Sequence, residues 1–226
     1  MSDGLERRQV EELLAQVEPY SALEGEDVAR LALSCRTVRL APHEVLLRDE
    51  ELISSAYVLA EGRLVRYLLT AEGRRLLLND TSSKAAFATA AALGGMGHIG
   101  TIEAVEPSVV VGVPTQELET LAAKCPSFSQ SLAHVLARSS IRQTRALYEL
   151  MFPVPVRLAR RLVRDAGGAK GLDLAVSKAV LAEALGTVPE TLSRALGTLR
   201  SRGLIEVEGS RVIIVDERGL RSYACL

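Results

Sequence analysis

The sequence has few of the residues that hold metals. Its 226 residues include three cysteines and three histidines, and Cys35, Cys125 and Cys225 stand far apart. No two cysteines have the CxxC spacing of zinc or iron–sulfur sites. This spacing argues against a cysteine-held metal centre. We expect reduced thiols, with Cys35 and Cys125 among apolar core residues.

Long hydrophobic runs are also missing. No apolar stretch approaches the roughly 20 residues needed to cross a bilayer. The start, MSDGLERRQVEELL, has no apolar segment of the kind found in signal peptides. We therefore expect a cytoplasmic protein that does not contact a membrane. The enzyme motifs GxSxG, HExxH and the P-loop do not occur, and GGMG has no lysine after it to bind a phosphate, which argues against an enzyme.

The chain has almost no net charge. Its 27 Lys and Arg and 28 Asp and Glu leave a formal charge of −1. Affinity for a nucleic acid would therefore need a local concentration of basic residues. A hydrophobic content of 48% with 24% charged residues is typical of folded, soluble proteins, and the length allows one large domain or two small ones.

Short β-rich runs dominate from Val38 to about Val113. Examples are VRL, AYVLA, RLVRYLLT and VVVGV, separated by turn signals such as EG. This spacing predicts an antiparallel barrel or sandwich. Amphipathic segments at Val10–Val17 and Gly25–Ala32 predict helices before it. We expect an α+β protein with three parts: a β-barrel domain (1–126), a long helix (127–152) and a C-terminal domain (153–226).

A long helix is expected from Ser127 to about Met151, because apolar residues recur there at spacings of three and four. One small barrel is too short to cover a helix of this length, so we expect it to pair with a second copy. The alternative is packing against its own barrel. Pro153 and Pro155 then predict a hinge. The residues assigned to the dimer surface are Leu132, Val135, Leu136 and Leu147.

The C-terminal part carries the pattern of a helix-turn-helix. A helix is expected at Val156–Ala166, followed by GG and a short strand in LDLAV. Ser177 is expected to cap the helix KAVLAEAL, and Gly186 to end it. A second helix then begins in VPETLSRALGTLRSRG.

Two features of this second helix guide its interpretation. Thr187 and Glu190 have the T-x-x-E spacing of a capping box. Leu192, Leu196 and Leu199 form an apolar stripe that predicts the buried face. After the helix, LIEV and VIIV flank EGSR, which predicts a β-hairpin with Gly209 at its tip. Two helices joined by a short turn and followed by a hairpin predict a winged helix-turn-helix.

The start of the second helix has the chemistry needed to contact bases. Recognition helices contact base edges through residues near their N-terminus. Arg194 matches guanine, Glu190 can accept from cytosine, and Ser193 can add a contact. Two structural alternatives are a capping role for Glu190 and an i, i+4 ion pair with Arg194. A further alternative is a basic face that binds an acidic protein partner. Lys178, Arg200, Arg202 and Arg211 offer phosphate contacts.

At this point the chain resembles the bacterial transcription regulators related to the cyclic-AMP receptor protein and the fumarate-nitrate reduction regulator. GTVPETLSR, from Gly186 to Arg194, is similar to the family signature G-x-x-x-E-T-x-S-R, in the form of the fumarate-nitrate branch. The resemblance implies a homodimer on palindromic double-stranded DNA, with Glu190, Ser193 and Arg194 on TTGA-like half-sites. It also implies RNA polymerase as a partner. The full set expected at DNA phosphates is Lys178, Thr187, Thr191, Arg200, Gly209 and Arg211.

The segment expected to bind an effector departs from the pattern of cyclic-nucleotide-binding relatives. That cassette is similar to F-G-E, about nine residues, then R-S or R-A, whereas this chain reads FATAAALGGMGHIGT from Phe87 to Thr101. Thr89 stands in place of the ribose-binding glutamate and His98 in place of the phosphate-binding arginine. Neither can replace the missing group. We therefore expect no control by cyclic AMP. The N-terminal cysteine cluster of the oxygen-sensing branch is missing too, which argues against an iron–sulfur cluster.

The effector therefore stays open, and there is no certain cofactor. Histidine is the usual proximal haem ligand. Among His43, His98 and His134, the candidate is His98 in the degenerate cassette. A haem-dependent sensor of nitric oxide or carbon monoxide is thus one alternative, and a loop histidine in a cassette that has lost its ligand is the other. The residues assigned to the effector pocket are Phe87, Thr89, His98 and Thr101.

Overall fold

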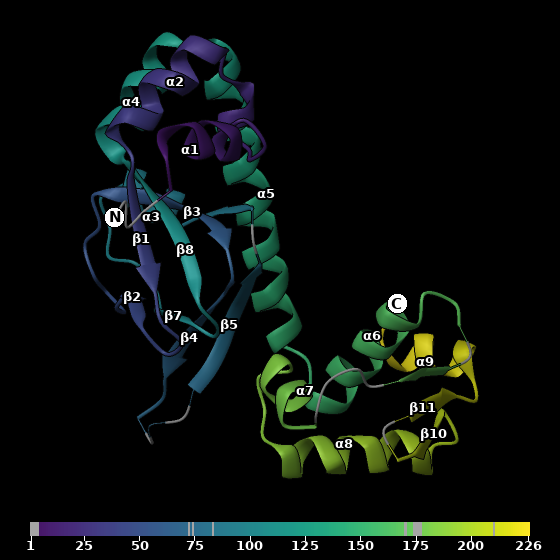
Figure 1. Ribbon diagram of the computed structural model, residues 1–226. Helices are drawn as coiled ribbons and strands as arrows, with labels where there is room; N and C mark the ends of the chain where they lie inside the picture. Colours follow the sequence, from purple (N-terminus) through teal and green to yellow (C-terminus); the bar gives the residue numbers. More distant parts are fainter. Residues whose placement is uncertain are drawn as a thin grey trace. The chain divides into compact units, whose positions relative to one another are not determined.

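The computed structural model of the protein divides into two compact units, residues 1–141 and 142–226, shown in Figure 1. It describes residues 5–71, 73, 75–82, 84–169, 171–173, 178–209 and 211–226. The side chains of 171–173, 179 and 183 lie outside this description. The expected division into three parts, with boundaries at 126 and 152, stays a prediction, because helix α5 contributes residues to both units.

Helices precede the sheets of the first unit, as expected. They are α1 (Arg7–Leu14), the short 3-10 helix η1 (Tyr20–Ala22) and α2 (Gly25–Ser34). The Gln9 side chain accepts a hydrogen bond from the Glu6 N–H at 2.8 Å, which satisfies one backbone donor at the start of α1. In Figure 1 these helices lie at one end of the sheets, together with α4 (Thr115–Lys124).

Two four-stranded antiparallel sheets form the β-rich part, which confirms the expected fold class. One has the order β1 (Arg36–Leu40), β8 (Ser108–Pro114), β3 (Ser55–Glu61), β6 (Ala85–Phe87). The other has the order β2 (Val45–Leu47), β7 (Thr101–Ala104), β4 (Arg63–Leu69), β5 (Arg75–Ser82). Buried residues of both sheets form one core cluster: Leu40, Leu47, Leu59, Leu64, Ile102, Ala104 and Val110.

The expected EG turn joins β3 to β4 and requires glycine. Gly62 has φ +90°, a backbone conformation that other residues rarely adopt. A Cβ at this position would stand 2.3 Å from Ser108 Oγ and 2.6 Å from the Pro107 carbonyl oxygen. The turn therefore brings the β3–β4 connection directly against the start of β8.

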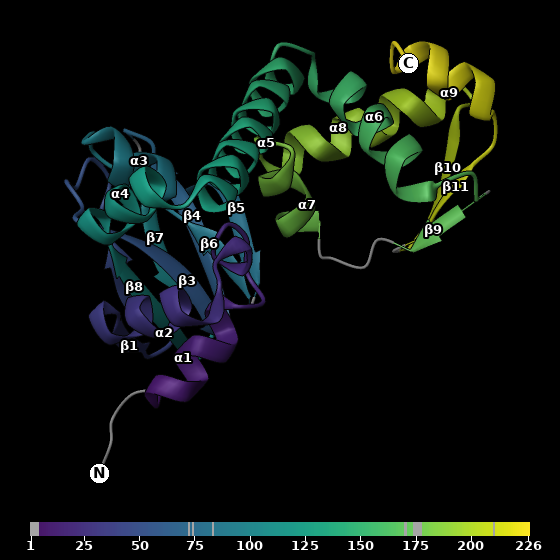
Figure 2. The same cartoon turned by 90° about the horizontal axis from the view of Figure 1, so that it is seen from above.

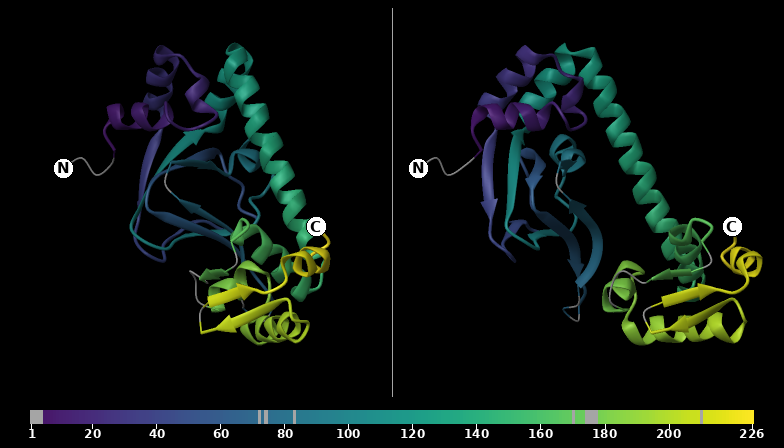
Figure 3. Two further views of the ribbon diagram at one scale, coloured as in Figure 1. Left: turned by 90° about the vertical axis from the view of Figure 1, so that its right-hand side faces the viewer. Right: turned by 45° about the vertical axis from the view of Figure 1, so that its right-hand side comes forward.

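Helix α5 runs from Pro126 to Leu150, close to the expected bounds, and both views in Figure 3 show it as one long helix. Phe128 and Leu132 are buried in the core of the first unit, and Leu136 packs against the same cluster. Leu132 is already covered by its own domain, because it is only 6% exposed. We therefore leave Leu132 out of the proposed dimer surface. Val135 is partly buried, and Leu147 is exposed.

The second unit contains a three-stranded sheet and a group of helices. Helix α6 (Val154–Ala166) begins two residues before the expected Val156, because Pro153 is its N-cap and Pro155 fits its first turn. The sheet has the order β10 (Ile205–Glu208), β11 (Arg211–Ile214), β9 (Gly171–Asp173), and β9 lies beside the hairpin in Figure 2. The remaining helices are α7 (Lys178–Ala184), α8 (Pro189–Ser201) and α9 (Glu217–Tyr223). In the described part of the chain, no helix is long and apolar enough to cross a membrane.

Candidate DNA-binding surface and effector region

The turn between α7 and α8 is built around Gly186. Its φ is +60°, the left-handed conformation expected after a helix end. The Thr187 N–H then donates to the Ala182 carbonyl at 2.9 Å, which closes the end of α7. The expected cap at Ser177 lies outside the described residues.

Helix α8 does not begin with the expected capping box. Its N-cap is Val188, and no side chain of the described residues caps it. The helix starts at Pro189, which has no N–H and a fixed φ suited to a first helical position. This places Thr187 one residue before the N-cap and Glu190 at the second helical position. Because the capping box needs the N-cap and the third position, the T-x-x-E interpretation is wrong by one residue.

The two faces of α8 differ as the sequence predicts. One face is buried in the core of the second unit and consists of Leu192, Ala195, Leu196 and Leu199. The other face is exposed and carries Glu190, Ser193, Arg194 and Arg200. In Figure 1 α8 runs along the lower edge of this unit. The packing of the leucine face therefore holds Glu190, Ser193 and Arg194 toward solvent within little more than one turn.

The exposed side chains of α8 make few hydrogen bonds with other described residues. The Arg194 guanidinium donates to Thr191 Oγ1 at 3.1 Å, and Thr198 Oγ1 donates to the Arg194 carbonyl at 3.0 Å. Over the described residues, no ion pair joins Glu190 to Arg194. Both structural alternatives for Glu190, a cap and an i, i+4 ion pair, therefore lose support.

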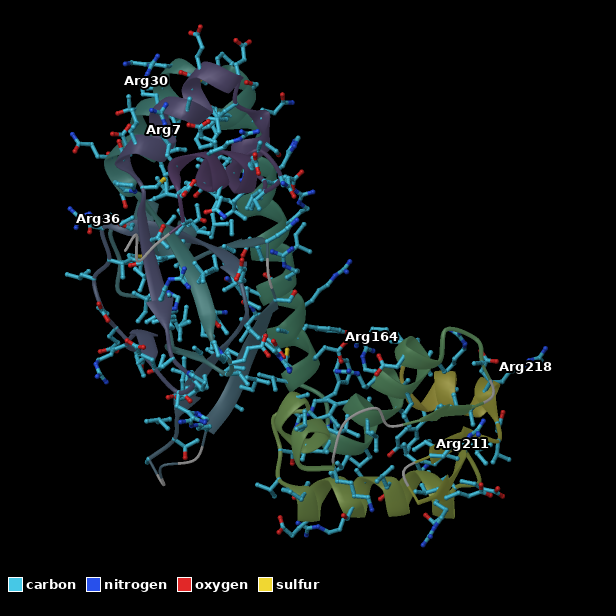
Figure 4. All side chains as sticks on the ribbon, viewed as in Figure 1. Arg7, Arg30, Arg36, Arg164, Arg211 and Arg218 are labelled. Atoms are coloured by element: carbon cyan, nitrogen blue, oxygen red, sulfur yellow. The ribbon has the colours of Figure 1, made fainter. Side chains whose placement is uncertain are left out.

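The expected hairpin lies beside α8, and its strands run one residue further on each side than the sequence predicts. Glu208 pairs with Arg211, and Gly209 has φ +61°, which suits a tight hairpin turn. Arg211 is exposed and is labelled with Arg218 of α9 in Figure 4. Arg202, just after α8, stacks over the Tyr223 ring at 4.9 Å. Lys178 and Arg200 are exposed, while Thr187 and Thr191 are partly buried.

The degenerate cassette lies in the first unit around α3 (Thr89–Gly94). Phe87, at the end of β6, stacks on Tyr57 with ring centroids 5.6 Å apart. Thr89 begins α3 and is buried. Thr101 begins β7 and pairs with Tyr67 of β4. Phe87 and Thr89 are thus packed within the domain, and Thr101 is part of the sheet that contains β7.

His98 is fixed by its backbone and buried at its ring. Its N–H donates to the Glu51 carbonyl at 2.8 Å, and its carbonyl accepts from the Glu50 N–H at 2.7 Å. The residue is 3% exposed, and its Nε2 has no hydrogen-bond partner among the described residues. Burial, followed by the positive charge of Arg66, lowers the pKa of His98. Its imidazole is therefore neutral at pH 7.

A neutral imidazole with an unpaired nitrogen has the chemistry of a haem ligand. The burial of His98 argues against haem binding, because the iron of a haem needs open access to that nitrogen. Within the described segments, no group of three or more His, Cys, Asp or Glu side chains could hold a metal ion. The haem alternative therefore stays a prediction.

The structure adds two charged residues that sequence reasoning did not single out. Glu103 of β7 is buried and accepts hydrogen bonds from the Tyr67 hydroxyl at 2.9 Å and from Arg75 at 3.1 Å. Arg66 of β4 has a buried Nε without a hydrogen-bond partner in the described parts of the chain. A sequence signal existed for Arg66, since it shares one strand face with Leu64.

Two family models match the two units. The cyclic nucleotide-binding domain matches residues 37–125, and the Crp-like helix-turn-helix domain matches residues 156–223. These ranges include the degenerate cassette in the first case and both helices with the hairpin in the second.

Whole-chain comparisons agree with these models. A CRP-like cAMP-activated global transcriptional regulator of Mycobacterium tuberculosis is 24% identical over 95% of this chain and 100% of its own length. A CRP-family transcriptional regulator of Thermus thermophilus has a solved structure with a TM-score of 0.56 and 26% identity, covering 84% of this chain and 97% of that one. The structure of FixK2 from Bradyrhizobium japonicum gives a TM-score of 0.58 at 20% identity, covering 84% and 96%.

The matched domains occur in the order found in these regulators, and the helix-turn-helix is the element through which such proteins bind DNA. The chain therefore belongs to the CRP/FNR family of DNA-binding transcription regulators, with an N-terminal cyclic nucleotide-binding-type domain and a C-terminal Crp-like helix-turn-helix.

Proposed function

We propose that the protein binds a palindromic DNA site with TTGA-like half-sites as a homodimer, without control by cyclic AMP. The observation that carries this proposal is the exposed face at the start of α8. Glu190, Ser193 and Arg194 lie on it, and neither a cap nor an ion pair within the described residues occupies the carboxylate. Unoccupied polar groups at the start of a recognition helix are available to base edges.

Each of the three residues has a distinct role in this proposal. The Arg194 guanidinium donates two hydrogen bonds to guanine O6 and N7, after its weak contact with Thr191 is released. The Glu190 carboxylate accepts from a cytosine N4 amino group. The Ser193 hydroxyl contacts a neighbouring base. Phosphate contacts from Lys178, Thr187, Thr191, Arg200, Gly209 and Arg211 set the position of the helix without reading sequence.

The homodimer is supported by apolar residues that the chain leaves exposed along α5. Ile141, Leu147 and Leu150 are 56%, 67% and 51% exposed, and Met151 just after the helix is 81% exposed. Exposed apolar residues of this size, gathered at one end of a helix, are typical of an interface. Val135 and Leu136 are partly covered by their own domain, so we assign them a position at the margin of this surface.

Independence from cyclic AMP is supported by the cassette. Thr89 is a buried hydroxyl and His98 a buried neutral imidazole, so neither supplies the charge that a ribose or a cyclic phosphate would need. RNA polymerase is the further partner that we propose for the bound dimer.

The test is selection of bound sequences from random duplex DNA at fixed salt, with no ligand added. Enrichment of a palindrome with TTGA-like halves supports both the base-reading residues and the independence from an effector. Enrichment only after addition of cyclic AMP would contradict the independence. Equal retention of all sequences, with a strong salt dependence, would contradict base reading by α8.

The alternative function is a haem-dependent gas sensor of the same family. The observation that favours it is His98 Nε2, which has no hydrogen-bond partner among the described residues. Its test is a haem titration followed by absorbance. A Soret band that disappears in His98→Ala, with His43→Ala and His134→Ala unchanged, supports this alternative. A titration without a band, or a band that survives in His98→Ala, contradicts it.

A further inference from the structure

Helix α8 contains a glycine in its interior. Gly197 lies four residues before the end of the helix, and its φ is not in the positive range that favours glycine. Glycine destabilises a helix interior relative to alanine, because it loses more backbone freedom when the chain folds. The backbone conformation of α8 therefore gives no reason for a glycine at this position.

Packing within the chain does not require this glycine either. A Cβ built on Gly197 would meet no atom of the described residues within 4 Å, apart from its own neighbours in the helix. By contrast, a Cβ on Gly62 would stand 2.3 Å from Ser108 Oγ. Gly62 is needed inside its own unit, whereas the side chain that Gly197 lacks would occupy open space.

Gly197 lies on the exposed face of α8. It follows Ser193 by four residues and Arg194 by three, and these spacings place residues on one face of a helix. Glu190 lies on the same face, two helical turns before Gly197. The opposite face is the buried leucine face of α8. The face that carries the three candidates for base contacts therefore continues into a stretch of backbone without a side chain.

The position of Gly197 along α8 indicates what approaches it. Seven residues separate it from Glu190, which is about 10 Å along the helix axis. A major groove is about 12 Å wide and a helix with its side chains is about 10–12 Å across, so the fit is tight. Recognition helices contact bases near their N-terminus, and the residues that follow pass the sugar–phosphate backbone beside the groove. A residue without a side chain leaves room for that backbone.

We propose that Gly197 is a specificity-determining residue, because its missing side chain lets the sugar–phosphate backbone of the DNA lie against the backbone of α8. This close approach allows Glu190 and Arg194 to reach the base edges, so the size of residue 197 determines how deeply the helix enters the groove. This role of Gly197 rests on the proposed base-reading face of α8. It does not depend on which half-site sequence that face reads.

The experiment is a size series at this position, Gly197→Ala and Gly197→Met, in the full chain. Fluorescence anisotropy measures the affinity for the duplex that the wild type selects and for a random duplex of equal length. Gly197→Met should weaken binding to the selected duplex at least about tenfold, because α8 no longer reaches the bases, and Gly197→Ala should cause a smaller loss. Both variants should keep the salt-sensitive affinity for the random duplex, which comes from phosphate contacts.

The stability of the variants separates this role from a structural one. Both should unfold at a higher urea concentration than the wild type, because alanine and methionine favour a helix interior more than glycine and no described atom obstructs their Cβ. Gly25→Met is the matched control, since Gly25 at the start of α2 also has open space around a Cβ. It should leave both DNA affinities unchanged.

Three results would overturn the proposal. Equal binding of the selected duplex by the wild type and Gly197→Met would refute the role of Gly197 and leave base reading by α8 intact. A lower urea midpoint in Gly197→Ala would show that the glycine serves folding. A wild type that binds all sequences alike would contradict base reading by α8 itself, and the role of Gly197 with it.

Discussion

The Arg160 guanidinium of α6 binds the Glu149 carboxylate at the end of α5, with Nε at 3.1 and 2.9 Å from its two oxygens. Arg160 also donates from Nη1 to the Ala224 carbonyl at 2.9 Å, and its guanidinium lies 4.8 Å from the centroid of the Phe152 ring. The side chain of Arg160 is 10% exposed. One buried arginine thus joins the last turn of α5, helix α6 and the C-terminal end of the chain.

Replacing Glu149 should therefore destabilise the second unit. Glu149→Ala leaves Arg160 buried without its carboxylate, and we expect a loss of about 1–3 kcal/mol in the free energy of unfolding, measured with urea. The double variant Glu149→Leu, Arg160→Met should recover most of that loss, because it removes both charges.

The control for this prediction is the ion pair between Arg161 and Asp165, which lies on the same helix but is more exposed. Arg161→Ala should change the free energy of unfolding by less than about 0.5 kcal/mol. An equal loss from Arg161→Ala and Glu149→Ala would show that burial of the Arg160 pair carries no special stability.

Arg194→Ala should weaken binding to the selected site by about 1–3 kcal/mol and relax the choice of base at one position of each half-site, because a bidentate contact to guanine is lost. Arg200→Ala should weaken binding to all sequences alike and lower the salt dependence by about one counterion. Fluorescence anisotropy with site variants at several salt concentrations separates the two. Arg218→Ala on α9 is the control, and wild-type affinity in Arg194→Ala would refute its role.

Variants at the start of α8 can separate an effect on folding stability from an effect on DNA recognition. Because neither side chain caps the helix, Thr187→Ala and Glu190→Gln should each change the free energy of unfolding by less than about 0.5 kcal/mol. Glu190→Gln should still change base preference. Asp216→Ala is the positive control, since Asp216 caps α9 by accepting from the Gly219 N–H at 2.9 Å, and its loss should cost about 1 kcal/mol. A comparable cost in Glu190→Gln would restore the capping role.

His98 predicts a pH dependence of the first unit. Burial and then the charge of Arg66 lower the pKa of His98, against the smaller opposing effects of Asp49 and Glu51. As pH falls below about 6.5, the unfolded chain takes up the proton first. The stability contributed by neutral His98 is therefore complete above about pH 6.5 and is lost progressively below it. Urea unfolding at about pH 7.5 and 5.5 should show a smaller difference in His98→Gln, and an unchanged difference contradicts the assignment.

The exposed end of α5 predicts the oligomeric state. Leu147→Glu and Met151→Glu place charges in the proposed apolar interface, so each should raise the dimer dissociation constant at least about tenfold, equivalent to roughly 1.4 kcal/mol. Sedimentation velocity over a concentration series measures it. Leu52→Glu, at a residue that is 75% exposed outside α5, is the control. A dimer unaffected by both α5 variants would place the interface elsewhere.

The sequence predicted the parts of the molecule that depend on local pattern. The leucine stripe of α8, the glycine at 186 and the hairpin at Gly209 all follow from spacing and turn chemistry, and the structure has each of them. The T-x-x-E spacing predicts an N-cap at Thr187, one residue before the N-cap of α8 in the structure. Pro189 explains the difference, because proline suits the first helical position and so places the N-cap at Val188.

Long-range packing explains what the sequence did not reveal. Leu132 has the spacing of an interface residue, but its burial depends on helices more than 90 residues earlier in the chain, which share its core cluster. Alternation along RLVRY places Arg66 on the same strand face as Leu64, but only the pairing with Ile102 shows that this face is the inner one. Nothing in the loop sequence around His98 indicates that its Nε2 has no hydrogen-bond partner in the described part of the chain.

The continuity of α5 determines how the second unit can be studied as a separate fragment. A fragment that starts at Pro153 includes every helix and strand from α6 onward but lacks Glu149, so Arg160 would retain its Ala224 contact and lose its carboxylate. A fragment that starts at Arg142 keeps the last turns of α5 and the pair intact. The shorter polypeptide should therefore give misleadingly weak DNA affinity through partial unfolding, even though it contains every residue expected to touch DNA.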